Sequence, residues 1–268
     1  MRRSMRNPTA TLKPDIPKIR HQKGLYGVFV NVGAIILVLW LIAYPLSFLP
    51  EPIGSNAAYF AEGIRVTVLL TMVSGIAGIL LGIVTALAKT SRFHILRWLA
   101  SSYVMAIRGT PLLVQILFTY FALPILVPWL RLDDFAAASV ALSLNVGAFN
   151  AEALRAGLLA VPQGQLEAAR SLGMNGRHVF MDVVFPQAFK IALPSLANNL
   201  IALLKDSSLA FGIGVVELTN VGNRVQAASF QPVPVLLTTA VLYFVLTSLL
   251  SGAVAAIESR YHVERRSS

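Results

Sequence analysis

The sequence predicts an all-α, polytopic membrane protein with six transmembrane helices, and three observations lead to this fold class. The 268 residues are 56% hydrophobic and 13% charged, with a mean hydropathy of +0.70, which is more apolar surface than a soluble domain of this length buries. Six apolar stretches are each long enough to cross a bilayer, at about 20 residues per crossing. The cations behind the net charge of +10 lie in short segments between those stretches, where loop charge orients membrane helices.

The first apolar stretch predicts an uncleaved membrane anchor. It is longer than the apolar region of a secretory signal, and Phe48–Pro52, which follows it, contains no small-residue cleavage site. The six stretches run approximately Leu25–Leu49, Ile64–Ala88, Trp98–Val127, Phe135–Leu159, Leu193–Gly214 and Val235–Ile257.

Loop charge predicts that both termini are cytoplasmic. Residues 1–24 form a basic arm with seven cations and one acid, and the loop after the second stretch is also basic. A loop on the opposite side holds the acidic pair Asp133 and Asp134. By the positive-inside rule, residues 1–24, residues 160–186 and the tail at 261–268 lie in the cytoplasm.

The third stretch is too long for one straight helix. Trp98 and Trp129 flank it as an aromatic belt does, yet they are 31 residues apart, or about 46 Å along a continuous helix. The hydrocarbon core is only about 30 Å thick. Pro111 lacks a backbone N–H and follows the flexible Gly109, so we expect a break there, with residues 92–107 as a separate interfacial helix.

The segment Gln165–Pro186 is polar and sharply punctuated, although it lies between two apolar blocks. Gln165–Leu172 predicts about two helical turns, and Gly173 suits the left-handed residue that closes a helix. Asn175 is placed to cap a second short helix, which we expect Pro186 to end. Two short helices joined at a glycine corner would make a rigid projection.

The first of these helices has an apolar face. Leu166, Ala169 and Leu172 follow one another at helical spacing, with Glu167 and Arg170 beside them. A rigid projection of this kind transmits force from a moving partner to the spans that it joins. An ordinary loop helix explains the same residues equally well.

Two charges interrupt the fifth stretch. Lys205 and Asp206 lie near the middle of this otherwise apolar run, where one charged side chain costs at least about 2.5–3.5 kcal/mol. Asn198 and Lys205 are seven residues apart, as are Asn199 and Asp206, so each pair shares a helix face. Such groups are expected to face the bundle interior or a polar cavity, and Asn199 thereby becomes a candidate for a substrate pathway.

These charges have two interpretations of about equal weight. In the first, Asp206 meets the ammonium group of a substrate, while Ser207 and Ser208 donate to its carboxylate. In the second, Asp206 forms a structural ion pair with Arg108 of another helix. Gln115, just after the expected break, is a further candidate for the pathway.

Two other patterns predict structural contacts. Glu152 and Arg155, three residues apart near the cytoplasmic end of the fourth stretch, are interpreted as an ion pair that positions the following loop. Gly78 and Gly82, with Ser74, present a face of small residues on the second stretch. Such a face predicts close helix packing, within the chain or between two chains.

The sequence excludes several classes of function. It contains no cysteine, so neither a disulfide framework nor a thiolate metal site is possible, and its four histidines lack ligand spacing. It lacks the phosphate-binding G-x-x-x-x-G-K-[ST] motif, so any ATP must be hydrolysed by another chain. The charge placement argues against nucleic-acid binding. We therefore expect no enzyme, no resident cofactor and no metal.

Three short motifs stand out as R-G-T-P-L-L-V-Q at 108–115, A-E-x-x-R at 151–155 and K-D-S-S-L at 205–209. Together with the segment Glu167–Pro186, they resemble motifs of ATP-binding-cassette importer permeases, and in particular of the family for polar amino acids such as histidine, glutamine and arginine. The family's EAA loop is matched from Glu167 to Pro186, and the resemblance covers about residues 60–260. It implies a five-helix permease core with a coupling loop at 160–186, to which residues 25–49 add a helix in front.

The resemblance also implies a mechanism and partners. The coupling loop would seat in a groove of an ATP-binding subunit, through Glu167, Ala168, Ala169, Arg170, Leu172 and Gly173. The partners would be ATP-binding subunits, a second permease chain, identical or related, and an extracytoplasmic solute-binding protein, in a bacterial cytoplasmic membrane. The rival class is an ion-gradient-driven transporter or channel, with Lys205 and Asp206 as a proton or ion relay.

Overall fold

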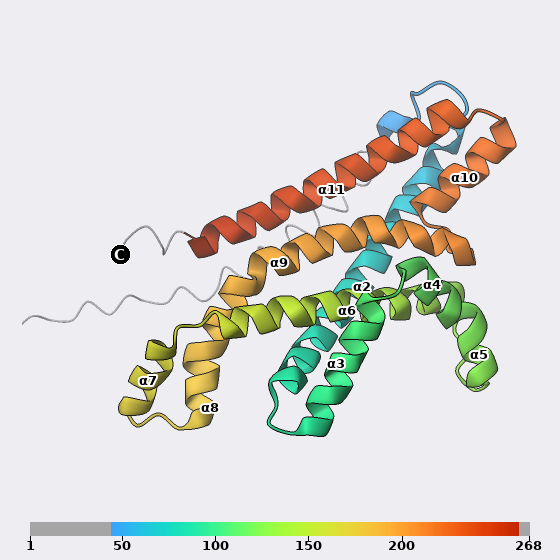
Figure 1. Cartoon of the computed structure of the whole chain (residues 1–268). Coiled ribbons are helices and arrows are strands. Elements are labelled where there is room, and N and C mark those ends of the chain that lie inside the picture. The colour runs from blue at the N-terminus through green and yellow to red at the C-terminus, as the bar shows by residue number, and fades with distance from the viewer. Residues whose placement is uncertain (1–43, 263–268) are drawn as a thin grey trace, which may run out of the picture.

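The computed structural model describes residues 44–262, and every regular element in that range is helical (Figure 1). In chain order the elements are η1 (Gly54–Asn56), α2 (Ala57–Thr90), α3 (His94–Arg108), α4 (Leu112–Leu117), η2 (Phe118–Ala122), α5 (Leu123–Leu126), α6 (Asp134–Leu159), α7 (Gln163–Ser171), α8 (Gly176–His178), η3 (Val179–Val184), α9 (Phe185–Asp206), η4 (Ser207–Ile213), α10 (Leu218–Ser229) and α11 (Pro232–His262).

Three helical segments of the described chain are long and apolar enough to cross a membrane. They are Gly54–Thr90, Gly176–Ile213 and Pro232–Glu258, and they contain the second, fifth and sixth predicted stretches. The predicted first helix lies outside the described residues except for its last six positions. The third and fourth predicted stretches have more complicated structures, because one is bent and the other is enclosed by protein.

The fourth stretch forms α6, as predicted, but it is too polar to meet the same criterion by itself. Its polar residues include Asn145, Asn150 and Glu152. These polar residues are tolerated because of where the helix lies. α6 packs against α2 along most of its length and against α9 on another side. A helix surrounded by other helices meets protein rather than lipid, so it tolerates polar side chains that bond to its neighbours.

The face of small residues on α2 is used within the chain. A Cβ atom at Gly78 would lie 2.2 Å from Cγ1 of Val146, and one at Gly82 would lie 2.6 Å from Cβ of Asn150. The Ser74 hydroxyl donates to a backbone carbonyl of α6, at 3.3 Å. The prediction of close packing is therefore confirmed, and its partner is α6.

The expected break in the third stretch is confirmed. α3 ends at Arg108, and Pro111 adopts extended backbone before α4 begins. The helical path turns by 108° between α3 and the run from α4 to α5. Each of these two parts is 15 residues, or roughly 22 Å, long, so only the bent pair together has the length of a span.

The prediction that Pro186 ends a short helix is wrong. The helical path runs without interruption from Gly176 to Ile213, and Pro186 lies in the first turn of α9. The wider π-helical turn η3 immediately precedes this proline. A π turn changes the backbone pairing at the point where proline cannot donate, so the chain continues as a helix. The same device precedes Pro124, where η2 leads into α5.

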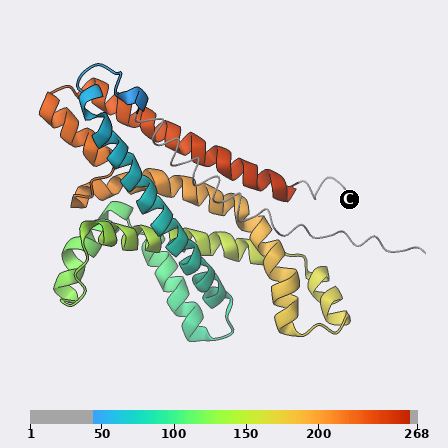
Figure 2. The same cartoon turned by 180° about the vertical axis from the view of Figure 1, so that it is seen from behind.

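This continuation also moves the charges of the fifth stretch. The prediction placed Lys205 and Asp206 near the middle of a span, whereas the structure places them in the last turn of α9. From Ser207 the path tightens into the 3₁₀-helix η4, which ends at the left-handed Gly214, with φ of 97°. The charged pair therefore lies at a change of helix type, close to the end of the molecule opposite α7 and α8 (Figures 1 and 2).

Candidate functional site

α7, α8 and η3 form a helical hairpin that projects beyond the adjoining ends of α6 and α9 (Figures 1 and 2). We call residues 160–186 the coupling hairpin. α7 begins after Pro162, whose extended backbone turns the chain out of α6. The side chain of Asn175 accepts a hydrogen bond from the His178 N–H, at 3.0 Å, so the predicted cap of the second helix is confirmed.

The corner of the hairpin has a specific backbone geometry. Gly173 has φ of 78°, as the sequence predicted. The N–H of Met174 donates to the Ala169 carbonyl at 3.2 Å, and the N–H of Gly173 donates to the Arg170 carbonyl at 2.9 Å. These two bonds define a Schellman motif, which satisfies carbonyls at the end of α7 and fixes the exit angle of the chain.

The coupling hairpin has its own small hydrophobic core. Ala169 is 5% exposed and packs with Val161, Val179, Val184 and Ala188. An isolated surface loop has no such core, so these contacts hold the two arms of the hairpin together as one body.

The outer surface of the hairpin is formed by the other residues of the EAA motif. Glu167, Ala168, Arg170 and Gly173 are exposed. Leu172 is 82% exposed, so the prediction that it shares the packed face of Leu166 and Ala169 is wrong. α7 ends at Ser171, and Leu172 leaves the helical path before reaching that face. The result is an exposed apolar side chain at the tip, flanked by charges.

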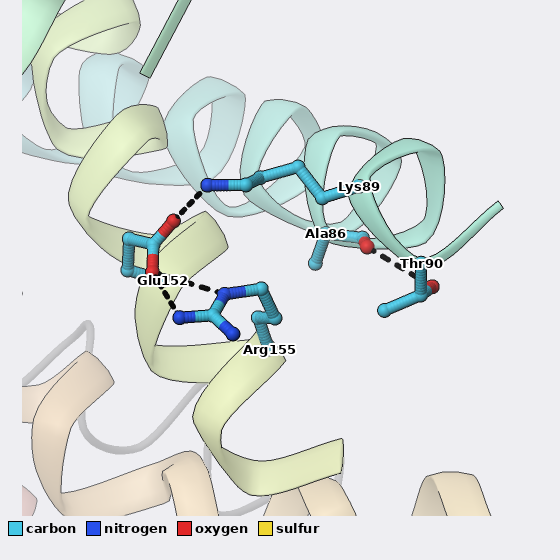
Figure 3. A network of polar contacts seen from close by, with 5 residues as sticks. All are labelled: Ala86, Lys89, Thr90, Glu152 and Arg155. Carbon is cyan, nitrogen blue, oxygen red and sulfur yellow. Dashed lines mark hydrogen bonds and ion pairs between the residues drawn. The ribbon is translucent and has the colours of Figure 1, made fainter. Parts of the chain in front are cut away.

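Above the hairpin, Glu152 joins two helices (Figure 3). Its Oε2 accepts from Nη2 of Arg155 at 2.8 Å and from Nε at 3.0 Å, which confirms the predicted ion pair. Its other oxygen accepts from the Lys89 ammonium at the end of α2, a partner that the sequence analysis missed. Lys89 is the only cation in the last turn of α2. One carboxylate thereby ties α2 to α6.

The two remaining candidates near the break, Gln115 and Arg108, both contact α6. The Gln115 side chain donates to the Ile107 carbonyl at 2.7 Å and accepts from the Asn145 amide at 3.1 Å, so it connects α3, α4 and α6. The Arg108 guanidinium lies 5.0 Å from the centre of the Phe149 ring, a cation–π contact. It does not reach Asp206, and no carboxylate within residues 44–258 lies in ion-pair distance of Arg108.

The candidates on α9 and η4 lie in different environments. Asn199 donates to the Asn150 side chain at 3.0 Å, which links α9 to α6. Lys205 is exposed, and Asp206 is half-buried. Ser207 is fully buried and donates to the Leu204 carbonyl at 2.8 Å. The pair at 205–206 thus lies on the outside of a single chain.

A buried carboxylate lies close to this pair. Glu217 is 0% exposed and caps α10, accepting from the N–H groups of Thr219 and Asn220, each at 2.8 Å. It also accepts from the Tyr243 hydroxyl of α11, at 2.7 Å. Burial raises the pKa of Glu217 and outweighs its hydrogen-bond donors, which lower it. The sequence analysis did not single out this acid, because its partner Tyr243 on α11 is distant in the chain.

Beside Glu217 the molecule has an open hollow of about 300 Å³. The hollow lies between α9, η4, α10 and α11. Its lining residues are Lys205, Ser208, Thr219, Leu236, Thr239, Ala240 and Tyr243. By contrast, no group of three potential metal ligands occurs among the described residues.

The chain is similar to known proteins. Residues 78–263 match the model of a family described as "Binding-protein-dependent transport system inner membrane component". The chain belongs to this family. The matched region contains the coupling hairpin, the Glu152 cluster and the hollow, so all three lie within the matched domain. The protein is a membrane-spanning transport subunit of the inner membrane, and the resemblance inferred from the sequence motifs is confirmed.

Curated relatives and solved structures agree with this membership. The chain is 42% identical to the L-cystine transport system permease protein TcyB of Bacillus subtilis, covering 74% of this chain and 84% of the relative. It is 38% identical to the arginine transport system permease protein ArtQ of the same organism, covering 75% and 92%. It is 35% identical to the glutamine transport system permease protein GlnP of Escherichia coli, with the same two coverages.

The fold comparison gives the same result. A crystal structure of an amino acid ABC transporter with histidines superimposes with a TM-score of 0.72 at 37% identity, covering 77% of this chain and 95% of that one. A chain of the inward-facing MetNI methionine transporter, at 22% identity and a TM-score of 0.67, shares the fold. The arrangement of α2 to α11 is therefore the arrangement of an importer permease.

Proposed function

We propose that the protein is the permease subunit of an ATP-driven, binding-protein-dependent importer of polar amino acids. The coupling hairpin carries this proposal, because it combines an internal core with an exposed tip that has no packing partner among residues 44–258. The relatives named for cystine, arginine and glutamine transport support an amino acid as the cargo. ATP would be hydrolysed by a partner subunit, and this chain would bind no cofactor.

The proposed topology has six transmembrane helices with both termini in the cytoplasm. Residues 1–24 would be a basic cytoplasmic arm, residues 25–49 an added helix, residues 60–260 the permease core and residues 261–268 a cytoplasmic tail. Two basic features support this orientation. Arg92 lies in the turn between α2 and α3, and it is flanked by Lys89 in the last turn of α2 and Arg97 in the first turn of α3.

The mechanism follows from how the hairpin is attached. ATP binding would draw two ATP-binding subunits together, and each would carry a coupling hairpin through contacts with Glu167, Leu172 and their neighbours. Because a Cβ atom at Gly157 would lie 2.4 Å from the Ala188 carbonyl oxygen, α6 and α9 touch where they leave the hairpin. A movement of the hairpin therefore moves both helices together, and the two permease chains change from inward-open to outward-open.

The substrate pathway is proposed to run between two permease chains. Lys205, Asp206 and Ser208 lie at the surface of one chain or near it, where a second chain would enclose them. Ser207 lies directly beneath this surface, and Asn199 and Gln115 bond to α6 behind it. We assign structural roles to Arg108, which contacts Phe149, and to Glu152 and Arg155, which pair with each other while Glu152 also binds Lys89.

Reconstitution tests the proposal. The permease is placed in proteoliposomes with its ATP-binding subunit, its second permease chain and the loaded binding protein, and uptake of labelled glutamine, arginine and cystine is measured. We expect uptake only with ATP inside and binding protein outside. Uptake driven by a proton or sodium gradient, without the ATP-binding subunit, would instead establish an ion-gradient-driven transporter or channel.

A further inference from the structure

The turn between α2 and α3 carries a surface that is both basic and apolar. This turn projects on the same side of the molecule as the coupling hairpin (Figures 1 and 2). Two arginines and four large apolar side chains are exposed here, in the turn and in the first two turns of α3. We call these six residues the α3 corner, and they are Arg92, Phe93, Ile95, Arg97, Trp98 and Leu99.

The two arginines of the α3 corner have no counter-ion in the described part of the chain. Within residues 44–258, no carboxylate lies in ion-pair distance of Arg92 or Arg97. The Arg97 guanidinium lies 2.8 Å from Nδ1 of His94, a polar contact that supplies no negative charge. Lys89 differs from both, because it binds Glu152. The corner therefore offers two uncompensated guanidinium groups, whose fork of N–H donors suits the oxygens of a phosphate.

The apolar side chains lie on the face of α3 that the described chain leaves uncovered. α3 packs on α2 and α6, and its buried residues Ala100 and Val104 lie on the packed face. Ile95, Trp98 and Leu99 follow one another at helical spacing on the opposite face, and they are 74%, 67% and 52% exposed. A helix end that combines exposed apolar side chains with cations is typical of the membrane–water interface.

Charge and hydropathy together select the occupant of this surface. The basic arm, residues 1–24, has seven cations and one acid, so two further arginines would repel it. A free inorganic anion would satisfy the arginines and leave the apolar face in water. An anionic phospholipid matches both parts, because its phosphate meets the cations and its acyl chains meet the apolar side chains. The indole of Trp98 is also a side chain that prefers the headgroup level of a bilayer.

We propose that the α3 corner is a binding site for an anionic phospholipid of the cytoplasmic leaflet. Arg92 and Arg97 bind the phosphate, and the acyl chains lie along Ile95, Trp98 and Leu99. The inference rests on the proposed function for the side of the membrane on which the corner lies. It adds a lipid partner beside the Lys89–Glu152 contact, so a bound lipid stabilises the corner next to the contact that ties α2 to α6.

Lipid binding is measured by native mass spectrometry on the delipidated complex, titrated with phosphatidylglycerol or phosphatidylcholine. We expect the wild type to prefer phosphatidylglycerol. The double variant Arg92→Gln/Arg97→Gln should bind phosphatidylglycerol at least about fivefold more weakly and phosphatidylcholine as before, since one cation near an anionic lipid contributes about a factor of five. Arg92→Lys/Arg97→Lys keeps the charge and should keep most of the preference. Arg65→Gln/Arg131→Gln removes two exposed cations elsewhere on the chain and should change nothing.

Photo-cross-linking identifies what covers the corner in a membrane. The photoreactive residue p-benzoylphenylalanine replaces Ile95, or Ile76 of α2 as the matched control, since both are exposed isoleucines on helices. The complex is illuminated in membranes that contain both lipids, and the adducts are identified by mass. We expect adducts at position 95 to be enriched in phosphatidylglycerol relative to the bulk lipid, whereas adducts at position 76 follow the bulk composition.

Four outcomes would overturn the lipid site. They are equal affinities of the wild type for the two lipids, an unchanged affinity for phosphatidylglycerol in Arg92→Gln/Arg97→Gln, a protein subunit as the adduct at position 95, and a loss of binding in both double variants of the corner that accompanies a lower melting temperature in phosphatidylcholine. The last would indicate a role of the arginines in folding. Failure of the proposed function is recognised separately, as a wild-type complex that binds phosphatidylglycerol but shows no ATP-dependent uptake.

Discussion

At the scale of single residues, Glu152 shows how a local pattern can be predicted while a distant partner is missed. The spacing of Glu152 and Arg155 predicts their ion pair, because residues three apart share a helix face. Lys89 is 63 positions away in the chain, so its contact depends on how closely α2 packs on α6. No local rule contains that information. Leu172 shows a different error. The helical spacing of Leu166 and Ala169 is correct within α7, but α7 ends at Ser171, so the same spacing does not place Leu172 on the packed face.

Replacing Glu152 by Gln should destabilise the complex, because Lys89 and Arg155 then share no carboxylate in a half-buried site. The loss of charge-assisted bonds costs about 1–3 kcal/mol. Thermal unfolding of the purified complex measures it. Glu62→Gln, which breaks an exposed pair with Arg65, is the control and should cost under about 1 kcal/mol. Equal effects of the two variants would contradict the structural role assigned to Glu152.

A second residue-scale prediction concerns Asp206, which is half-buried and has no ion-pair partner among residues 44–258. Asp206→Asn keeps the size of the side chain and removes its charge. We expect reduced amino acid uptake while the ATP-binding subunit remains bound, as measured by co-purification and by transport in proteoliposomes. If uptake remained normal, Asp206 would be a structural residue and not part of the pathway.

At the scale of elements, the hairpin corner was predictable and the continuation through Pro186 was not. Gly173 is preceded by a helical pattern, and glycine is the residue that ends such a pattern in the left-handed region. Proline normally ends a helix because it has no backbone N–H. Here the π-helical turn η3 changes the backbone pairing just before Pro186, so the helix continues. Short π turns lack a composition signal of their own, so the sequence predicted a short second helix and a separate fifth stretch where the structure has one continuous path from Gly176 to Ile213.

The corner can be tested by comparing two glycines of the coupling hairpin. A Cβ atom at Gly173 or Gly164 would meet no atom within 4 Å, so neither substitution causes a clash. Only Gly173 has a positive φ, and a β-branched residue there costs about 1–2 kcal/mol of backbone strain. Gly173→Val should therefore weaken co-purification with the ATP-binding subunit or ATPase coupling, whereas Gly164→Val should not. Intact spans are verified by an unchanged helical circular dichroism spectrum, and unchanged coupling in Gly173→Val would refute the role of the corner.

At the scale of the whole molecule, the described chain contains one continuous route from the hairpin to the hollow. α6 is fixed to α2 by the Gly78 and Gly82 contacts and by Glu152, and α9 leads from the hairpin directly to Lys205. The sequence analysis predicted the coupling loop at one end of this route and the pathway candidate Lys205 at the other. Between these two ends, α2 and α6 approach closely because Gly78 and Gly82 have no side chain. The sequence shows these glycines but does not indicate which helix packs against them.

The crossing of α6 and α9 is where this route is most sensitive. A Cβ atom at Gly157 would lie 2.4 Å from the Ala188 carbonyl oxygen and 3.2 Å from Cβ of Ala192, so Gly157→Ala forces the two helices apart. Overpacking of this kind costs about 1–3 kcal/mol and should lower the melting temperature by roughly 2–4 °C per kcal/mol. Because the helices then no longer move together, stimulation of the ATPase by loaded binding protein should fall more than the basal rate. Gly252→Ala, where a Cβ atom meets nothing within 4 Å, is the matched control and should leave both rates unchanged. Undiminished stimulation in a folded Gly157→Ala complex would show that force passes from the hairpin to the spans by another route.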